Sequence, residues 1–230
     1  MSAAANALKL KRKDLKLLVI GNSGVGKTSL VQRWIGKDFK EDTSATTVSE
    51  VAANKLYKLG ETLFKVQLWD IGGQDKTPAV TKIFTKDSHG CIIVSDVTNK
   101  STLDDTLDWK KAVEEEIRFT DGGNIPFLLI QNKIDLIEDS TERDNLETET
   151  KGFSRSYGFV NYFLTSAKTK HNTEDAIQFF MEHVSRRLMN YLEAGNEDVN
   201  TMEHRRTVAI SKGGSVPEKE QKEKKKNCCK

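Results

Sequence analysis

A glycine-rich run near the start of the chain has the residue types of a phosphate-binding loop. The run Gly21-Asn22-Ser23-Gly24-Val25-Gly26-Lys27-Thr28 follows the apolar residues 15–20 and precedes a segment with helical spacing. Its three glycines let the backbone curl so that successive N–H groups point inward, and the following helix adds its positive N-terminus. Lys27 supplies a charge for the β- and γ-phosphates and Thr28 a hydroxyl for Mg²⁺. The loop predicts a site for a nucleoside triphosphate.

Two further motifs follow apolar runs and point to guanine as the base. Asn132-Lys133-Ile134-Asp135 follows residues 126–131, and ligands of open α/β sheets lie where such strands end. The Asp135 carboxylate can accept hydrogen bonds from guanine N1–H and the exocyclic amine, which adenine cannot offer. Asn132 can bond to the base or brace the phosphate loop, and the stem of Lys133 can cover a ring face. Thr165-Ser166-Ala167-Lys168 can present a backbone N–H to the base oxygen, with Lys168 flanking the base.

A third region supplies groups for the metal ion and for the attacking water. Residues 64–68 alternate apolar and polar side chains, which predicts a strand that ends at Asp70. The Asp70 carboxylate can hold Mg²⁺ through water. Gly73 has no side chain to keep its N–H away from a γ-phosphate, and Gln74 can orient the water that attacks it. The order of these motifs along the chain makes a chance match implausible.

These motifs together resemble those of the Ras superfamily of small GTPases, and of its Rab branch in particular, over about residues 15–192. Three segments are most similar to the Rab proteins that serve lysosome-related organelles: Trp69-Asp70-Ile71, Asp108-Trp109-Lys110 and Tyr157-Gly158-Phe159. The resemblance implies a switch that binds GTP and GDP with Mg²⁺ and hydrolyses GTP. It also implies an exchange factor, a GTPase-activating protein, effectors that read the switch loops, a prenylation escort and a GDP-dissociation inhibitor.

The resemblance also implies a role for each motif residue. Phe39 would pack against the guanine, Thr46 would ligate Mg²⁺ in the GTP state together with Thr28 and Asp70, and Gln74 would position the water. The phosphates would be held by the loop residues Ser23, Gly24, Val25, Gly26, Lys27, Thr28 and Ser29 and by Gly73. The base would be held by Asn132, Lys133, Asp135, Ser166, Ala167 and Lys168.

The first switch departs from the family pattern. Where the family has Thr-Ile-Gly, this chain has Thr46-Thr47-Val48, so Thr47 is a second candidate for the metal ligand. Val51 stands where Rab proteins usually have an aromatic residue that packs with Trp69 and Phe84, and its loss changes the partner-facing patch between the switches. These changes leave nucleotide binding intact, but the sequence does not identify the effectors, the exchange factor or the organelle.

The order of the segments predicts an α/β fold of the P-loop NTPase class, with a mostly parallel six-stranded sheet covered by helices on both faces. Strands are expected at residues 15–20, 48–58, 62–69, 90–96, 126–131 and 162–165. Helices are expected at residues 27–36, 78–87, 101–119, 142–157 and 173–193. The GTPase domain would span residues 15–194, after an N-terminal extension at 1–14 and before a disordered tail at 195–230.

The tail has the composition of a membrane-anchoring segment. Residues 195–230 hold nine Lys/Arg against six Asp/Glu and few apolar residues, with four lysines (222, 224, 225 and 226) before Cys228-Cys229. Residue 227 is Asn, so the four-residue prenylation box fails, and the two cysteines resemble the doubly prenylated Rab terminus. Two lipid chains anchor a protein stably, and nearby lysines add attraction to anionic lipid. The alternative is a solvated tail with exposed thiols.

Overall composition narrows the class of protein. The apolar content of 37% can fill one core, and three cysteines do not indicate a disulfide framework. No apolar run approaches the roughly 20 residues of a membrane span, and no secretory segment is evident. We therefore expect a cytosolic protein, monomeric by default, that cycles to the cytoplasmic face of an intracellular membrane. A net charge of +2 without an aromatic platform argues against nucleic acid as a partner.

Two alternatives to a hydrolysing switch remain at this point. The altered first switch is compatible with a GTP-binding interaction module that hydrolyses almost nothing. A P-loop ATPase or nucleotide kinase shares the phosphate loop, but such kinases need a lid with several arginines, and the sequence has no such cluster.

Overall fold

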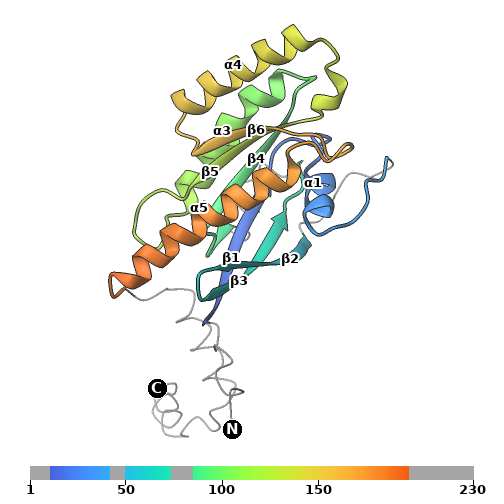
Figure 1. The fold of residues 1–230 in the computed structure, drawn as a ribbon. Helices are drawn as coiled ribbons and strands as arrows, with labels where there is room; N and C mark the ends of the chain where they lie inside the picture. The colour runs from blue at the N-terminus through green and yellow to red at the C-terminus, as the bar shows by residue number, and fades with distance from the viewer. Residues whose placement is uncertain (1–10, 42–49, 74–84, 197–230) are drawn as a thin grey trace, which may run out of the picture.

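The predicted strands assemble into one mostly parallel sheet (Figure 1). The structure is a computed structural model that describes residues 11–41, 50–73 and 85–196. The strand order is β2-β3-β1-β4-β5-β6, with β2 antiparallel to β3 and all other neighbours parallel. The strands are β1 (Lys11–Ile20), β2 (Glu50–Leu59), β3 (Thr62–Asp70), β4 (Gly90–Asp96), β5 (Phe127–Asn132) and β6 (Asn161–Leu164). The predicted fold is therefore confirmed.

Helices cover both faces of this sheet. In Figure 1, α5 crosses in front of the strands with α1 beside it, and α3 lies behind them. The helices are α1 (Lys27–Trp34), α3 (Ser101–Glu116), α4 (Ser140–Ser156) and α5 (Thr173–Glu193), and a 3₁₀ turn spans Ile134–Leu136. The helix predicted at residues 78–87 lies largely outside the described residues.

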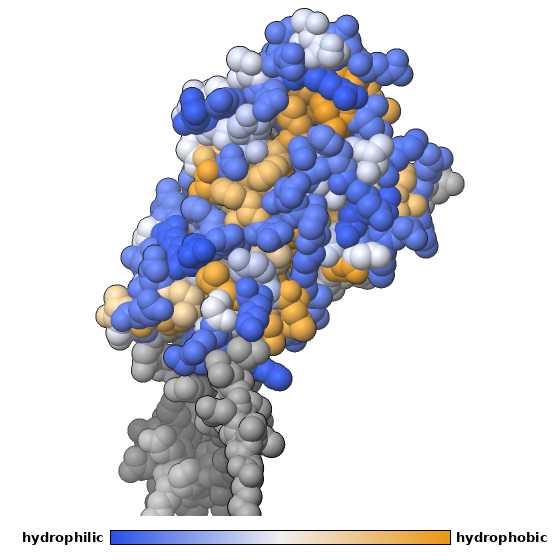
Figure 2. All heavy atoms as spheres, in the orientation of Figure 1, coloured by the Kyte–Doolittle hydropathy of each residue, from blue (hydrophilic) through white to orange (hydrophobic). Residues whose placement is uncertain are grey.

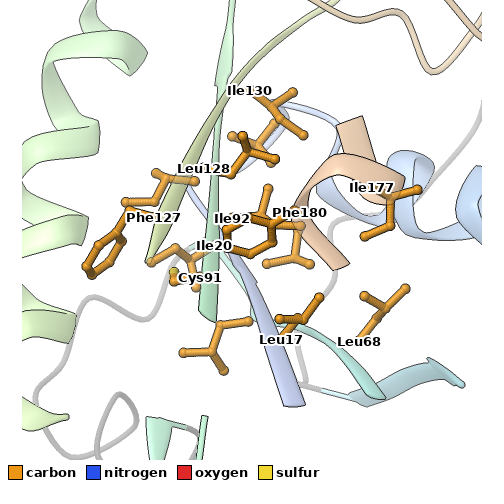
Figure 3. Close-up of a cluster of buried hydrophobic side chains, with 14 of the residues drawn as sticks. Leu17, Ile20, Leu68, Cys91, Ile92, Phe127, Leu128, Ile130, Ile177 and Phe180 are labelled. Atoms are coloured by element: carbon orange, nitrogen blue, oxygen red, sulfur yellow. The ribbon is translucent and has the colours of Figure 1, made fainter. Parts of the chain in front are cut away.

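The core lies on both sides of the two central strands. Every residue of β4 and β5 is buried, as expected for parallel strands between two layers of helices. Figure 3 shows Ile177 and Phe180 of α5 on one side of the strands, while Phe127 points to the other side. A Cβ at Gly90 would lie 2.9 Å from Phe180 and 3.0 Å from Val184, so this glycine lets α5 approach β4 closely.

Several element ends differ from those predicted. Strand β1 begins at Lys11 instead of residue 15, because residues 11–14 continue the backbone pairing with β3, from Lys11 opposite Thr62. These four residues carry polar side chains, so the apolar pattern that marks the rest of the strand is absent from them. Helix α1 ends at Trp34 and α3 at Glu116, two and three residues earlier than predicted. Strand β4 and helix α5 have the predicted bounds, residues 90–96 and 173–193.

The face shown in Figure 2 is mostly hydrophilic, with apolar residues visible between the hydrophilic ones. Three large apolar side chains are exposed among the residues that the structure describes: Leu56, Leu136 and Tyr157. Within the same part of the chain, no helix has both the length and the apolar character to cross a membrane.

Candidate nucleotide site

A cavity of about 420 Å³ lies at the carboxyl ends of the strands, where open α/β sheets bind ligands. It joins the phosphate loop to both base motifs and to Phe39. The predicted residues that line it are Ser23, Gly24, Gly26, Lys27, Thr28, Ser29, Phe39, Gly73, Asn132, Lys133, Asp135, Ala167 and Lys168. Lys40, Glu41 and Leu136 also line it and were not predicted. Val25 and Ser166 are buried beneath its wall.

The phosphate loop has the backbone that its glycines predict. Gly21, Gly24 and Gly26 have φ angles of 138°, 79° and 96°, which L side chains rarely adopt. A Cβ at Gly21 would also collide with the Val94 carbonyl, and one at Gly26 with the Asn132 amide. Helix α1 starts after Gly26 without a side-chain cap, so its first N–H groups face the cavity. An anion at this position would complete the helix N-terminus.

Lys27 lies within the curl of the loop. Its Nζ donates hydrogen bonds to the carbonyl oxygens of Gly21 at 2.8 Å and Asn22 at 2.9 Å. Burial lowers the pKa of Lys27 from 10.5 to about 8, although the nearby Asp70 carboxylate opposes this shift. A phosphate would supply the negative charge that this partly desolvated ammonium lacks.

Thr28 lines the cavity and contacts Asp70, which is buried behind it and does not line the cavity itself. The Thr28 hydroxyl donates a hydrogen bond to Oδ2 of Asp70. The other carboxylate oxygen, Oδ1, is buried and has no hydrogen-bond partner among the described residues. Burial raises the pKa of Asp70, although the Thr28 hydrogen bond and the nearby Lys27 ammonium oppose this shift, so a further cation would favour the charged form. A hydroxyl and an unpartnered carboxylate oxygen are the hard oxygen donors that Mg²⁺ prefers.

Gly73 lies against the phosphate loop. A Cβ there would collide with the backbone of Asn22 and Ser23, so only glycine fits so close to this peptide. The segment that begins the second switch and the phosphate loop are thus in direct contact at this point.

At the base end, Asn132 braces the loops. Its Nδ2 donates to the Val25 carbonyl at 3.0 Å, and its Oδ1 accepts from Thr165 Oγ1 at 3.2 Å and from the Ala167 N–H at 3.1 Å. The sequence left two roles open for Asn132, bonding to the base and bracing the phosphate loop. In the structure its side chain braces the loop. Asp135 is half-buried and lines the cavity nearby.

Arg33 is a residue of this site that the sequence analysis missed. From α1, its Nε donates to the Ala167 carbonyl at 2.7 Å and a terminal nitrogen donates to the Lys168 carbonyl at 3.0 Å. Its guanidinium carbon also lies 5.9 Å from the centre of the Phe39 ring. Arg33 therefore connects the base loop to the segment that carries Phe39.

A sequence comparison identifies the family. The Ras family profile matches residues 16–186. The human Ras-related protein Rab-32 is 34% identical over 197 residues, covering 86% of this chain and 85% of its own. The human Ras-related protein Rab-7L1 is 33% identical, and the match covers 74% of this chain and 82% of Rab-7L1. The Ras-related protein Rab7 of Cenchrus ciliaris is 31% identical, and the match covers 75% of this chain and 83% of Rab7.

The chain is a Rab small GTPase of the Ras family. It is related to the branch that serves lysosome-related organelles, as its sequence motifs predicted. This small GTPase uses GTP, GDP and Mg²⁺, hydrolyses GTP and acts as a switch in membrane traffic. The ATPase, the nucleotide kinase and the non-hydrolysing module are thereby set aside.

The Asp70 oxygens fit the metal ion that this small GTPase uses. The unpartnered Oδ1 and the raised pKa of the Asp70 carboxyl are both consistent with a site that binds a cation next to the Thr28 hydroxyl. Four predicted residues lie outside the described ranges: Thr46 of the first switch, Gln74 of the second, and Cys228 and Cys229 of the tail.

Proposed function

We propose that this protein is a GTP-hydrolysing switch that reaches the cytoplasmic face of an intracellular membrane through two lipidated cysteines. One observation carries the nucleotide part: a single cavity is lined by Lys27 and Thr28 at one end and by Asp135 and Ala167 at the other. The Thr28 hydroxyl is in turn hydrogen-bonded to Asp70. Metal, phosphate and base groups therefore lie along one continuous surface, as a bound nucleotide requires.

At the phosphate end, the loop residues 23–29 cradle the phosphates, and Lys27 exchanges its two carbonyl partners for phosphate oxygens. Mg²⁺ is held by Thr28, by Asp70 and, in the GTP state, by Thr46. When bound, the ion neutralises charge that develops on the phosphates during hydrolysis. Gly73 brings its backbone to the γ-phosphate, and Gln74 orients the attacking water.

At the base end, the Asp135 carboxylate accepts two hydrogen bonds from guanine. Asn132 acts through the loops that it holds together, and the stem of Lys133 covers one ring face. The Ala167 N–H already donates to Asn132 in the described structure, so the N–H of the next residue, Lys168, is the donor left for the base oxygen. Phe39 packs against the guanine at the opposite edge of the base site.

Hydrolysis without a partner is expected to be slow, on the order of 10⁻⁴ s⁻¹, because no arginine from an activating protein stabilises the developing charge. GTP would order both switch loops for effectors, and hydrolysis would release them. The substitution of Thr46-Thr47-Val48 for the family pattern affects the surface that effectors and the exchange factor read.

The membrane part of the proposal rests on the tail at residues 195–230. Cys228 and Cys229 would carry prenyl groups added with the help of an escort protein, and the preceding lysines would attract anionic lipid. A GDP-dissociation inhibitor would return the GDP form to the cytosol. The protein would act as a monomer, and nucleic acid would not be a partner.

The first test compares single-turnover hydrolysis of preloaded GTP by the wild type and by Gln74→Leu, with Mg²⁺. We expect the wild type to hydrolyse slowly and the variant to hydrolyse more slowly still, alone and with an activating protein. Equal rates would show that Gln74 does not orient the attacking water.

A second test addresses the base. Xanthine carries an oxygen in place of the exocyclic amine of guanine, so Asp135→Asn, whose side-chain amide donates one hydrogen bond and accepts another, should shift preference from GDP to xanthosine diphosphate. Competition between the two diphosphates measures this shift. An unchanged preference would show that Asp135 does not read the base.

A further inference from the structure

Asn22 of the phosphate loop is bound by its side chain to helix α3. Its Nδ2 donates to Oδ2 of Asp105 at 2.5 Å, and its Oδ1 accepts from the indole Nε1 of Trp109 at 2.9 Å. Trp109 is buried in the core, and Asp105 is half-buried one turn before it on the same helix. The anchor for Asn22 is therefore part of the rigid framework.

The chemistry of these three side chains is complementary. An indole N–H only donates and an ionised carboxylate only accepts, whereas an amide has one group of each kind. A carboxylate at position 22 would still accept from Trp109 but would repel Asp105. The amide is thus matched to both partners at once.

The backbone of Asn22 leads to the γ-phosphate end of the site. Its carbonyl accepts from Lys27 Nζ at 2.9 Å. The peptide that joins Asn22 to Ser23 is the one that the Gly73 backbone approaches so closely that a Cβ would collide with it. The peptide therefore contacts both groups that are assigned to the γ-phosphate, and the α3 anchor fixes it in place.

We propose that Asn22, Asp105 and Trp109 form a positioning network through which α3 sets the phosphate loop against Gly73 and thereby tunes GTP binding and hydrolysis more than GDP binding. The inference rests on the GTPase activity and on the nucleotide site, and it is independent of the lipid anchor. Helix α3 would then act on the γ-phosphate end of the site in addition to packing against the sheet.

The test inverts the amide–carboxylate pair in the full-length protein. The variants are Asn22→Asp, Asp105→Asn and the double variant, which has an acceptor at position 22 and an amide donor at position 105. Asp108→Asn is the matched control, because it makes the same change at an exposed site on the same helix. The readouts are the dissociation rates of fluorescent GDP and of a non-hydrolysable GTP analogue, and single-turnover GTP hydrolysis.

In Asn22→Asp, we expect the analogue to dissociate faster relative to GDP by at least about twofold, the lower end of coupling within one hydrogen-bond network, and hydrolysis to slow. The double variant should return both readouts toward the wild type, and Asp108→Asn should match the wild type. Trp109→Phe keeps an aromatic ring but removes the indole donor, and it should act in the same direction as Asn22→Asp.

A general loss of stability would accelerate the release of both nucleotides and leave their ratio unchanged, and that result would overturn the proposal. Failure of the double variant to restore the ratio would also overturn it, since the effect of residue 22 would then not pass through α3. A wild type that retains neither guanine nucleotide would overturn the nucleotide site itself. A wild type that binds and hydrolyses GTP, with variants identical to it, would overturn this inference alone.

Discussion

The Nζ atom of Lys133 lies 2.6 Å from Oδ2 of Asp96, which joins the end of β5 to the end of β4. The other Asp96 oxygen accepts hydrogen bonds from the Thr98 N–H at 2.9 Å and the Thr98 hydroxyl at 2.7 Å. Asp96 is thus fixed on one side and holds Lys133 on the other. Lys133 has a left-handed backbone conformation with a φ of 71°. The ion pair with Asp96 fixes the direction of its side chain, which the sequence motif does not specify.

Asp96→Asn should loosen Lys133 and accelerate GDP release by about tenfold, because a charge-assisted hydrogen bond at a mostly buried carboxylate is replaced by a neutral one. Release of fluorescent GDP measures the effect. The exposed pair between Lys100 and Glu149 provides the control, since Glu149→Gln breaks a surface ion pair of small energetic value. Equal effects of the two changes would contradict the role of Asp96.

Arg33→Lys should also accelerate GDP release, by roughly fivefold to tenfold. Lysine keeps the charge but cannot donate to the Ala167 and Lys168 carbonyls in the fork geometry of the guanidinium. The same substitution at Arg186, which is exposed and pairs with Glu182, serves as the control and should leave release unchanged. If Arg33→Lys released GDP at the wild-type rate, the link between α1 and the base loop would have no kinetic importance.

Asp70→Asn should abolish the dependence of GDP release on Mg²⁺. In the wild type, chelation of the metal should accelerate release by at least about tenfold, since an ion held by Thr28 and Asp70 would add positive charge beside the phosphates. In the variant the unpartnered Oδ1 carboxylate oxygen is lost, and release should be fast with or without the chelator. A variant that still responded to chelation as strongly as the wild type would show that Asp70 is not part of the metal site.

The lowered pKa of Lys27 predicts that nucleotide binding takes up protons. In the folded, nucleotide-free protein its pKa falls from 10.5 to about 8, so at pH 8 about half of these amines are neutral. Between these two values the unfolded chain binds more protons, and the free energy of unfolding therefore rises with pH in that window. Phosphate favours the ammonium form, so GDP binding at pH 8 should take up about half a proton.

Calorimetry of GDP binding in buffers of different ionisation enthalpy measures this uptake. Lys16 has a pKa of about 8 as well, but its Nζ donates to the Lys86 carbonyl and does not line the cavity. Lys16→Met should therefore retain the uptake. Loss of the uptake in Lys16→Met would show that Lys16, and not Lys27, takes up the proton.

The sheet could be predicted from the sequence because apolar runs mark its buried strands. Strand β4, in which every residue is buried, has the predicted bounds, whereas the first four residues of β1 carry no such mark and were missed. Backbone pairing with β3 holds those residues, and pairing depends on a neighbour that is distant in sequence. The ends of α1 and α3 were predicted too late because the apolar residues Ile35 and Ile117 continue the helical spacing just past the last helical residue.

The motif residues of the site were predictable because each has a local chemical reason to occur where it does. The residues that hold them were not. Arg33 and Asp105 each act on a partner more than eighty residues away in sequence, and nothing in their own segments distinguishes them from surface residues. For Asn132, the sequence left two roles open, and only the position of the Val25 carbonyl selects between them.

Helix α1 carries the proposed phosphate contact at one end and the support of the base loop near the other. Lys27 is its first residue and Arg33 its seventh, so the rise of an α-helix places them about 9 Å apart along a rigid axis. The spacing between the two halves of the ligand is therefore set within one helix and does not depend on loop conformation. Inserting a single residue between them would turn Arg33 by about 100° away from the base loop, so the length of α1 itself restricts which ligands can span the cavity.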